Sequence, residues 1–218
     1  MNTIKIIKNF IIFNTKPWLD FFISSTNLIT DIKDLQKIQH KSWDTVREIF
    51  SKKINELNLK TGVEIGVAFG GHSEYMLKNT QITKLYGIDP YKHFWFYFDP
   101  MNLSQRKFDF LYAFVIGKLN TFGDRFELIR TTSEKAVRYV DKIDFIYIDG
   151  NHSYEQTKKD IENWYEKINT GGLIGGDDYD HPSFPGVKKA VDEFFKQKDL
   201  QITVEHGGVW YVINNNLK

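Results

Sequence analysis

The sequence predicts an α/β fold with a doubly wound, mostly parallel, seven-stranded sheet, and three observations support this prediction. Apolar runs of strand length alternate with amphipathic segments of helical period, which is typical of βαβ units. A glycine-rich turn joins the first apolar run to the helix that follows it, in residues 66–71. The chain closes on two apolar runs joined at Gly207 and Gly208, which indicates a hairpin that adds an antiparallel strand.

The bulk composition suits one packed domain with a small extension. The 218 residues are 41% hydrophobic and 26% charged. We place the domain at residues 59–218 and an N-terminal arm with helices at residues 1–58. The 29 basic and 28 acidic residues leave a net charge of +1, which gives no case for a nucleic-acid partner. The absence of cysteine excludes disulfides, thiolate zinc sites and cysteine nucleophiles, and it is compatible with the cytoplasmic location that we expect.

The N-terminal arm is rich in apolar residues, but Lys8, Asn9, Lys16, Pro17 and Asp20 interrupt it. A membrane-spanning helix needs roughly 20 mostly apolar residues. A signal peptide needs an unbroken apolar segment and a cleavage site, so we predict neither a transmembrane segment nor a signal peptide. The arm is expected to pack on the domain or on a second subunit, as in a homo-oligomer. Contact with a membrane surface is the alternative.

The elements of the predicted fold follow one another in a regular order. Helical spacing of apolar residues predicts one or two helices in residues 32–57, ahead of the first strand. Strands are predicted at 62–67, 84–89, 125–130, 144–149 and 171–178. Helices are predicted at 71–79 with Ser73 as a candidate N-cap, and at 103–119, 133–140, 153–168 and 186–197. Two further strands form the closing hairpin in residues 200–214.

Polar residues gather where the predicted strands end. In an open α/β sheet, ligands bind beyond the carboxyl ends of the strands. Three of the five parallel strands end in carboxylates, at Asp89, at Asp149 and at the pair Asp177 and Asp178. A carboxylate at the end of a buried strand is costly unless something pairs with it, so this edge of the sheet is the predicted ligand site.

The turn "EIGVAFGGHSEYM" would let a ligand approach the backbone at a helix N-terminus. Its glycines, Gly66, Gly70 and Gly71, do not follow the G-x-G-x-x-G spacing of a dinucleotide site. Asp89 follows Gly66 by 23 residues and is placed to accept hydrogen bonds from ribose hydroxyls. The alternative is a solvated turn acid that precedes Pro90.

Five segments together resemble a known family. "GVEIGVAFGGHS", "YGIDPY", "IDGNHSYEQTKKDI", "GGLIGGDDY" and "GVKKAVDEFF", in this order from about residue 61 to 214, are similar to class I S-adenosylmethionine-dependent methyltransferases. Within that class they most resemble metal-dependent sugar O-methyltransferases with an IDG-x-H-x-Y strand end and a later DD. The resemblance implies a Rossmann-like fold, a cofactor, S-adenosylmethionine, and a sugar or small polyol-bearing metabolite as the acceptor.

The resemblance also implies roles for single residues. Glu64, Gly66 and Gly70 would line the methionine part of the cofactor, and Asp89 would hold its ribose. The resemblance would also place Thr132 and Ser133 near the adenine. The alternative role of these two residues is to cap the helix that follows.

The resemblance assigns Asp149, Asp177 and Asp178 as metal ligands, and elementary chemistry supports this assignment. Like charges brought together at neighbouring strand ends need a cation. Oxygen ligands favour Mg²⁺, Mn²⁺ or Ca²⁺ over Zn²⁺, and Mg²⁺ is the cation that we expect. Such a cation could lower the pKa of an acceptor hydroxyl. The alternative is that Asp178 caps a turn and Asp149 faces solvent.

His152 lies three residues beyond Asp149. In metal-dependent relatives a histidine at the matching place looks like the general base, because a neutral imidazole can take a proton at physiological pH. The alternative is a histidine at the start of a helix that orients Asp149. The aromatic run in residues 91–98 could stack on adenine or on a sugar, or form a lid or a dimer contact.

Three other functions compete with this interpretation. Tyr154 and Lys158 form the Y-x-x-x-K pair of short-chain dehydrogenases, but the glycine spacing is wrong for that class. Asp178 and Asp180 form a D-x-D that could hold a metal in a glycosyltransferase, but this leaves the glycine turn unexplained. A non-catalytic cofactor-binding subunit has no support in the sequence, because every expected polar strand end is present.

Overall fold

The computed structural model describes residues 44–95 and 102–215, so most of the N-terminal arm and residues 96–98 of the aromatic run lie outside the described residues. The strands are β1 (Thr61–Ile65), β2 (Lys84–Ile88), β3 (Phe126–Ile129), β4 (Ile143–Ile148), β5 (Ile168–Gly176), β6 (Thr203–Val204) and β7 (Trp210–Ile213). The helices are α4 (Asp44–Glu56), α5 (Gly71–Asn79), α6 (Gln105–Leu119), α7 (Ser133–Ala136), α8 (Tyr154–Tyr165) and α9 (Pro185–Gln197), with 3₁₀ turns η2 (Asn120–Arg125) and η3 (His206–Gly208).

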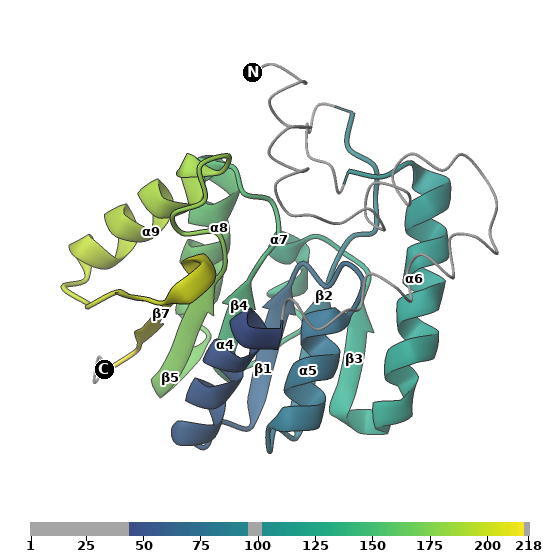
Figure 1. Cartoon of the computed structure of the whole chain (residues 1–218), viewed down its shortest axis with the longest axis horizontal. Coiled ribbons are helices and arrows are strands. Elements are labelled where there is room, and N and C mark those ends of the chain that lie inside the picture. Colours follow the sequence, from purple (N-terminus) through teal and green to yellow (C-terminus); the bar gives the residue numbers. More distant parts are fainter. Residues whose placement is uncertain (1–43, 96–101, 216–218) are drawn as a thin grey trace.

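The strands form one seven-stranded sheet in the order β3-β2-β1-β4-β5-β7-β6 (Figure 1). The strands β1 to β5 run parallel to one another, while β7 runs antiparallel to β5 and to β6. The predicted α/β class, with a mostly parallel sheet and a closing hairpin, is therefore confirmed. In the sheet β3 is followed by β2, β1, β4 and β5, and because these five strands run parallel, their carboxyl ends lie side by side along one edge.

Two hydrophobic clusters cover the two faces of the sheet. In β4 successive side chains alternate between them, because strand side chains point to opposite faces. Phe145 and Tyr147 pack in the cluster that contains residues of α4, α5 and α6. Ile146 and Ile148 pack in the cluster that contains residues of α7, α8 and α9. Burying both faces explains why the predicted strands are almost wholly apolar.

Helix α4 belongs to the same packed unit as the sheet. Its residues Phe50 and Ile54 are fully buried in the first cluster. The Phe50 ring lies edge-on to Tyr147 of β4, with ring centroids 4.8 Å apart. None of the helices in the two described ranges combines the length and the hydropathy that a membrane-spanning helix requires.

Several element boundaries differ from the sequence-based ones. The predicted helix at 133–140 is a single turn, Ser133–Ala136. The predicted helix at 153–168 ends at Tyr165, since Ile168 pairs with Ile143 and already belongs to β5. Ser73 is not the N-cap of α5, because Gly70 occupies that position with φ 68° and the Ser73 hydroxyl donates to the buried Glu64 carboxylate instead.

Helix α8 contains a buried acid, Asp160, that lies away from the strand ends and bonds to residues of α7 and α8. Asp160 is only 1% exposed, and its Oδ1 accepts a hydrogen bond from Gln156 Nε2 at 3.1 Å. The Ser133 hydroxyl also bonds to it, and Ser133 Oγ accepts from Trp164 Nε1 at 2.8 Å. Burial raises the pKa of Asp160 to about 6, although these hydrogen bonds lower it in part.

This pKa predicts a pH dependence of stability. A carboxyl whose pKa is higher in the folded state stabilises the fold below the unfolded pKa, and that contribution is lost as pH rises through about 6. The Asp160→Asn variant should therefore be more stable than the parent protein at pH 7.5, by on the order of 2 kcal/mol, and equal to it near pH 4. Urea unfolding at both pH values measures this difference. A variant that is equally destabilised at both would show that the charge has no part in it.

Candidate functional site

The carboxyl ends of four strands form a continuous edge. Each residue that follows a strand donates its backbone N–H to the last residue of the neighbouring strand. Gly66 donates to Ile88 O at 2.9 Å, and Asp89 to Ile129 O at 3.4 Å. In the same way Asp149 donates to Ile65 O at 2.8 Å, and Asp177 to Ile148 O at 3.3 Å. Backbone pairing therefore fixes the strand-end residues singled out in the sequence at one edge of the sheet.

Two positions of the glycine turn have positive φ, which favours glycine, and at the first of them there is also no room for a side chain. A Cβ on Gly66 would lie 1.8 Å from the carbonyl oxygen of Asp149, and φ is 89° there. Gly70 has φ 68° and lies against Leu119 of α6. From α6 the Lys118 ammonium also reaches the turn, 3.3 Å from Gly70 O and 2.7 Å from the Glu74 carboxylate. The turn therefore packs against the end of β4 through Gly66 and against α6 through Gly70.

Asp89 organises the backbone next to the turn. Its Oδ2 accepts from the N–H of Ala68 at 3.0 Å, and its Oδ1 accepts from the N–H of Tyr91 at 2.8 Å. Both donors have positive φ, 47° and 42°, a region that non-glycine residues rarely adopt. Burial raises the pKa of Asp89 to about 6, while the two backbone bonds oppose this shift. The carboxylate is therefore fixed in place beside the glycine turn.

Glu64 of β1 is 1% exposed and is held by the first turn of α5. The Ser73 hydroxyl donates to its Oε2, and His72 Nδ1 lies 3.4 Å from its Oε1. The His72 ring meets Tyr147 of β4 edge-on, with centroids 4.2 Å apart. Sequence reasoning did not single out His72. Its one signal was its position directly after Gly70 and Gly71, in the first turn of the helix.

The residues predicted to lie near adenine follow β3. Thr132 occupies the N-cap position of α7, where its side chain makes no capping bond. Ser133 is 7% exposed and its hydroxyl bonds to Trp164 and Asp160, so this side chain is engaged with α8. Any contact with a base at this place therefore falls to the backbone or to Thr132.

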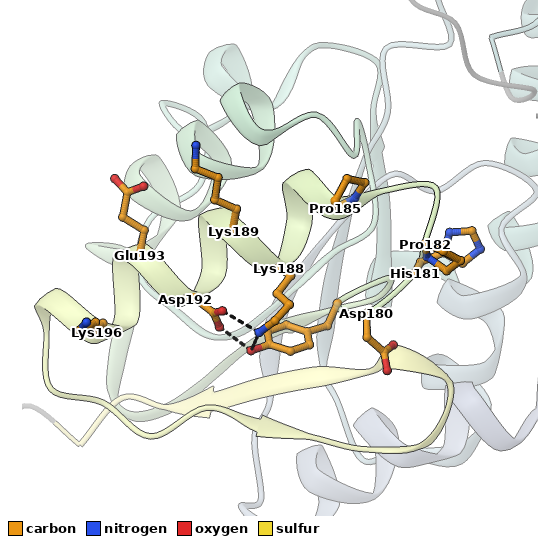
Figure 2. Close-up of a pocket in the computed structure, with 10 residues that line it drawn as sticks. Asp180, His181, Pro182, Pro185, Lys188, Lys189, Asp192, Glu193 and Lys196 are labelled. Atoms are coloured by element: carbon orange, nitrogen blue, oxygen red, sulfur yellow. Dashed lines mark hydrogen bonds and ion pairs between the residues drawn. The ribbon is translucent and has the colours of Figure 1, made fainter. Parts of the chain in front are cut away.

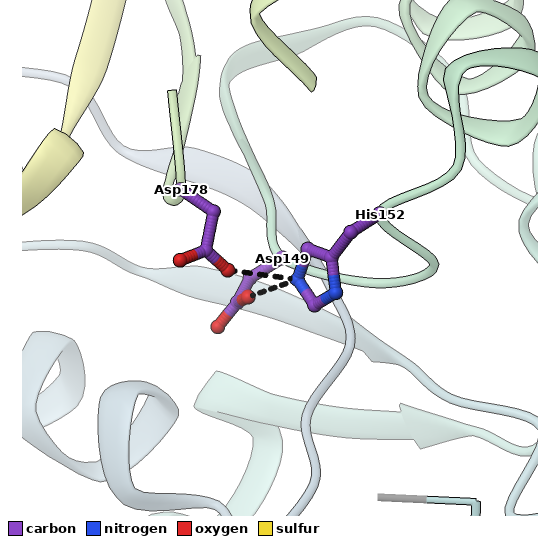
Figure 3. Close-up of side chains that lie close together, drawn as sticks. All are labelled: Asp149, His152 and Asp178. Atoms are coloured by element: carbon purple, nitrogen blue, oxygen red, sulfur yellow. Dashed lines mark hydrogen bonds and ion pairs between the residues drawn. The ribbon is translucent and has the colours of Figure 1, made fainter. Parts of the chain in front are cut away.

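Three side chains converge beyond β4 and β5 (Figure 3). His152 Nε2 lies 3.3 Å from Asp149 Oδ1 and 3.1 Å from Asp178 Oδ2. One possible ligand atom of each of the three lies within 4.8 Å of the others. The imidazole, which is 17% exposed, thus bridges two carboxylates that the chain separates by 29 positions. Asp178 has φ 61°, so its backbone is in the left-handed region.

Asp177, the third predicted metal ligand, does not lie with Asp149 and Asp178 in the group around His152. Its Oδ1 accepts the N–H of Asp178 at 2.8 Å, and it is not one of the three grouped residues. Burial and the charges of Asp149 and Asp178 raise the pKa of Asp177 well above its usual range. Burial likewise raises the pKa of Asp149. The predicted ligand set and the observed group therefore share Asp149 and Asp178, and the observed group has His152 as its third member.

The His152 ring is held from its other side by an aromatic stack. It lies nearly parallel to the ring of Phe184, with centroids 4.3 Å apart and 25° between the planes. His181 also stacks on Phe184, with ring centroids 4.9 Å apart. The loop between β5 and α9 therefore supplies Asp178, whose carboxylate lies beside His152, and Phe184, whose ring fixes the plane of the imidazole.

A cavity of about 610 Å³ lies next to this loop (Figure 2). Its lining begins directly after Asp178 and continues on α9. Lys188 there bonds to the Tyr179 hydroxyl at 2.8 Å and to Asp192 at 2.6 Å. The other lining residues are Asp180, His181, Pro182, Pro185, Lys189, Glu193 and Lys196. Aromatic and proline rings beside paired charges offer both an apolar surface and hydrogen-bonding groups.

The Y-x-x-x-K pair and the aromatic run are not part of the group around His152. Tyr154 and Lys158 both bond to Glu193 of α9, at 2.7 Å each, so they join two helices. In the aromatic run Tyr91 is fully buried and donates to Ala68 O at 2.9 Å. Trp95 is 83% exposed, and residues 96–98 lie outside the described ranges.

Comparison with known proteins identifies a family and one relative of this chain. Residues 63–179, more than half of the chain, match the sequence profile of a family described as "Methyltransferase domain". An uncharacterized protein, R132 of Acanthamoeba polyphaga mimivirus, is 31% identical over 140 residues, which cover 61% of this chain and 58% of that protein. The chain therefore matches less than two thirds of this relative's length.

Solved structures share the fold at low identity. CalS11, a calicheamicin methyltransferase, superimposes with a TM-score of 0.65 at 15% identity, covering 92% of this chain and 91% of that one. A second CalS11 structure, described as a TDP-rhamnose 3′-O-methyltransferase, gives 0.58 at 15% identity, with 92% of each chain covered. An O-methyltransferase from Bacillus cereus, in complex with SAH, gives 0.60 at 12% identity, covering 88% and 92%.

Proposed function

This chain belongs to the methyltransferase domain family, and we propose that it transfers a methyl group from S-adenosylmethionine to a hydroxyl of a sugar or small polyol-bearing metabolite, with the help of a divalent cation. The observation that carries the proposal is that two features of the sheet edge, the glycine turn and a group of polar side chains, lie beside each other. The carboxylate and imidazole group of Asp149, His152 and Asp178 lies directly beyond the glycine turn, which touches Asp149 through Gly66.

The residues present fit both groups that the reaction needs. For the cofactor, the turn lets a ligand reach the backbone, and the carboxylates of Glu64 and Asp89 suit an ammonium group and ribose hydroxyls. For the cation, Asp149 and Asp178 present hard oxygen atoms that lie near each other at the strand ends. S-adenosylmethionine supplies the methyl group, and a divalent cation lowers the pKa of a nearby hydroxyl.

The ligand set admits two arrangements. In the first, Asp149, Asp177 and Asp178 hold the cation and His152 serves as the general base. In the second, His152 itself is the third ligand, as its place between the two carboxylates suggests. We favour the first for Mg²⁺, which prefers oxygen ligands. His152 is then placed to accept the acceptor's proton while Phe184 keeps its ring plane fixed.

The cavity whose lining begins at Tyr179, directly after Asp178, favours a sugar as the acceptor. An aromatic face such as Tyr179 packs on the apolar face of a sugar ring, and paired carboxylates and ammonium groups bond to its hydroxyls. The similarity to CalS11, described as a sugar methyltransferase, agrees with this choice. The glycosyltransferase alternative finds less support, because Asp180 of the D-x-D is exposed and is not one of the grouped residues.

The proposal is tested by titration and turnover. S-adenosylmethionine should bind in a calorimeter with or without EDTA. Formation of S-adenosylhomocysteine, followed over a panel of sugars and polyols, should depend on Mg²⁺ and stop when EDTA is present. Absence of cofactor binding would sink the methyltransferase proposal. Turnover that EDTA does not change would remove the cation and leave the rest standing.

A further inference from the structure

We propose that Phe94 and Trp95, which lie between β2 and α6, dock this chain on an anionic lipid surface, an inference that does not depend on the proposed function. These two neighbours are both exposed, Trp95 by 83% and Phe94 by 40%. Large apolar side chains that lie together in water forgo the free energy of burial, so they mark a surface that meets a partner. Because they follow Asp89 at the carboxyl end of β2, docking brings this edge of the sheet near the lipid.

Hydrogen bonds at the base of the loop hold the backbone of the aromatic pair in place. Asn102 bonds to both backbone groups of Phe94, since its Oδ1 accepts from the N–H at 3.0 Å and its Nδ2 donates to the carbonyl oxygen at 2.6 Å. One residue earlier, the N–H of His93 donates to Gln105 Oε1 at 3.1 Å. The His93 ring also meets the Trp95 ring edge-on, with centroids 5.2 Å apart. The exposed position of the pair is therefore built into the loop.

Basic side chains flank the aromatic pair on both segments of the loop base. On the first segment, Lys92 is exposed and its Nζ lies 5.7 Å from the centroid of the Phe94 ring. On the second segment, Arg106 is exposed and directly follows Gln105, whose side chain bonds to the backbone of His93. An aromatic side chain beside exposed cations is suited to the boundary between acyl chains and headgroups.

The acids near the loop do not cancel this positive charge. In the described part of the aromatic run and in the first two turns of α6, Asp109 is the single acid. Its carboxylate pairs with Arg130, which follows β3. Lys92, Arg106 and Lys107 therefore leave an excess of positive charge around the aromatic pair. Anionic lipid headgroups complement such a cluster.

The size and the charge of this surface favour a lipid over a second protein. Two aromatic side chains offer at most about 500 Å². Each partner in a stable protein pair buries roughly 800 Å². Lysine is also depleted in protein interfaces, whereas aromatic side chains together with lysine and arginine are typical of segments that lie on membranes.

Vesicle flotation with the full chain tests the proposal. The parent protein should float with phosphatidylcholine vesicles that contain phosphatidylglycerol, and should bind pure phosphatidylcholine vesicles roughly tenfold more weakly. Trp95→Ala should bind the anionic vesicles roughly tenfold more weakly than the parent protein. Tyr139→Ala is the matched control and should bind as the parent protein does, because Tyr139 is 67% exposed but lies beyond α7.

Two further variants separate charge from aromatic contact. Arg106→Glu should weaken binding to the anionic vesicles roughly tenfold. Arg138→Glu, which makes the same change in net charge at an exposed arginine beside Tyr139, should have little effect. Trp95→Phe should keep most of the binding. It should lose the part of the tryptophan fluorescence that brominated lipids quench, since Trp95 is the tryptophan placed at the lipid.

Four outcomes would overturn the proposal. The first is that the parent protein does not bind the anionic vesicles. The second is that Trp95→Ala binds them as well as the parent protein does, which assigns the contact to another part of the chain. The third is that Tyr139→Ala loses as much affinity as Trp95→Ala. The fourth is that Trp95→Ala changes the sedimenting mass of the protein and not its vesicle binding, which assigns this surface to a second copy of the chain.

Discussion

Replacing Asp149 with asparagine should lower the rate of methyl transfer by about 100-fold or more, the largest effect that we expect from a single substitution. Asp149 connects the grouped polar residues to the glycine turn. Its carboxylate is grouped with Asp178 and His152, and its backbone packs against Gly66. Asparagine keeps the shape of the side chain and removes the charge that a cation requires.

The fold of this variant should survive. Burial raises the pKa of Asp149, and the charge of Asp178 adds to this while His152 opposes it, so on balance the ionised form is disfavoured in the protein without a cation. The melting temperature of Asp149→Asn should therefore not fall below that of the parent. Asp141→Asn is the matched control, because Asp141 is an exposed acid that precedes β4, at the opposite end of the strand from Asp149. Turnover by Asp149→Asn at the parent rate would take Asp149 out of the mechanism.

Replacing Asp89 with asparagine should weaken the binding of S-adenosylhomocysteine by roughly 10- to 100-fold, because a carboxylate accepts from the ribose hydroxyls more strongly than an amide does. Asparagine also disturbs the bonds from Ala68 and Tyr91, so loss of affinity alone is not decisive. A 2′,3′-dideoxy analogue of 5′-methylthioadenosine separates the two effects. The parent protein should discriminate against this analogue and Asp89→Asn should not. Equal discrimination by both proteins would place the ribose elsewhere.

The same carboxyl predicts a pH dependence of cofactor affinity. The pKa of Asp89 is raised to about 6 in the free protein, so the carboxyl is protonated below that pH and loses acceptor capacity. The affinity of the parent protein should thus be constant above pH 7 and fall by about tenfold for each pH unit well below 6. Asp89→Asn should lack this part of the pH dependence. Titrations at pH 7.5 and 5 measure it.

The fold was predictable because it depends on patterns that are local in the sequence. Short apolar runs such as those of β1 to β5 form strands in most folds, and a double glycine such as that of the closing hairpin forms a turn in most folds. Boundaries were less predictable. Ile168 looked like the end of a helix because its spacing fits one, and only its pairing with Ile143 makes it part of β5.

The site was predictable to the extent that it follows from strand ends. Asp89 and Asp149 are adjacent to buried strands, and parallel strands bring their carboxyl ends to one edge. The role of Ser73 was wrongly predicted as a cap, because capping preference is local whereas the attraction of Glu64, from another strand, is not. The stack of Phe184 on His152 joins separate loops and leaves no pattern in the sequence.

The sequence by itself determined the α/β class, the order of its elements and the edge of the sheet at which a ligand would bind, because periodicity and glycine placement act through the local backbone. Only the tertiary structure decided which polar atoms meet there. It placed His152 between Asp149 and Asp178, engaged Ser133 with Trp164, and turned His72 toward Glu64 with its other nitrogen unmatched. Such contacts depend on distances between strands and loops far apart in the chain, and these distances exist only once the sheet has formed.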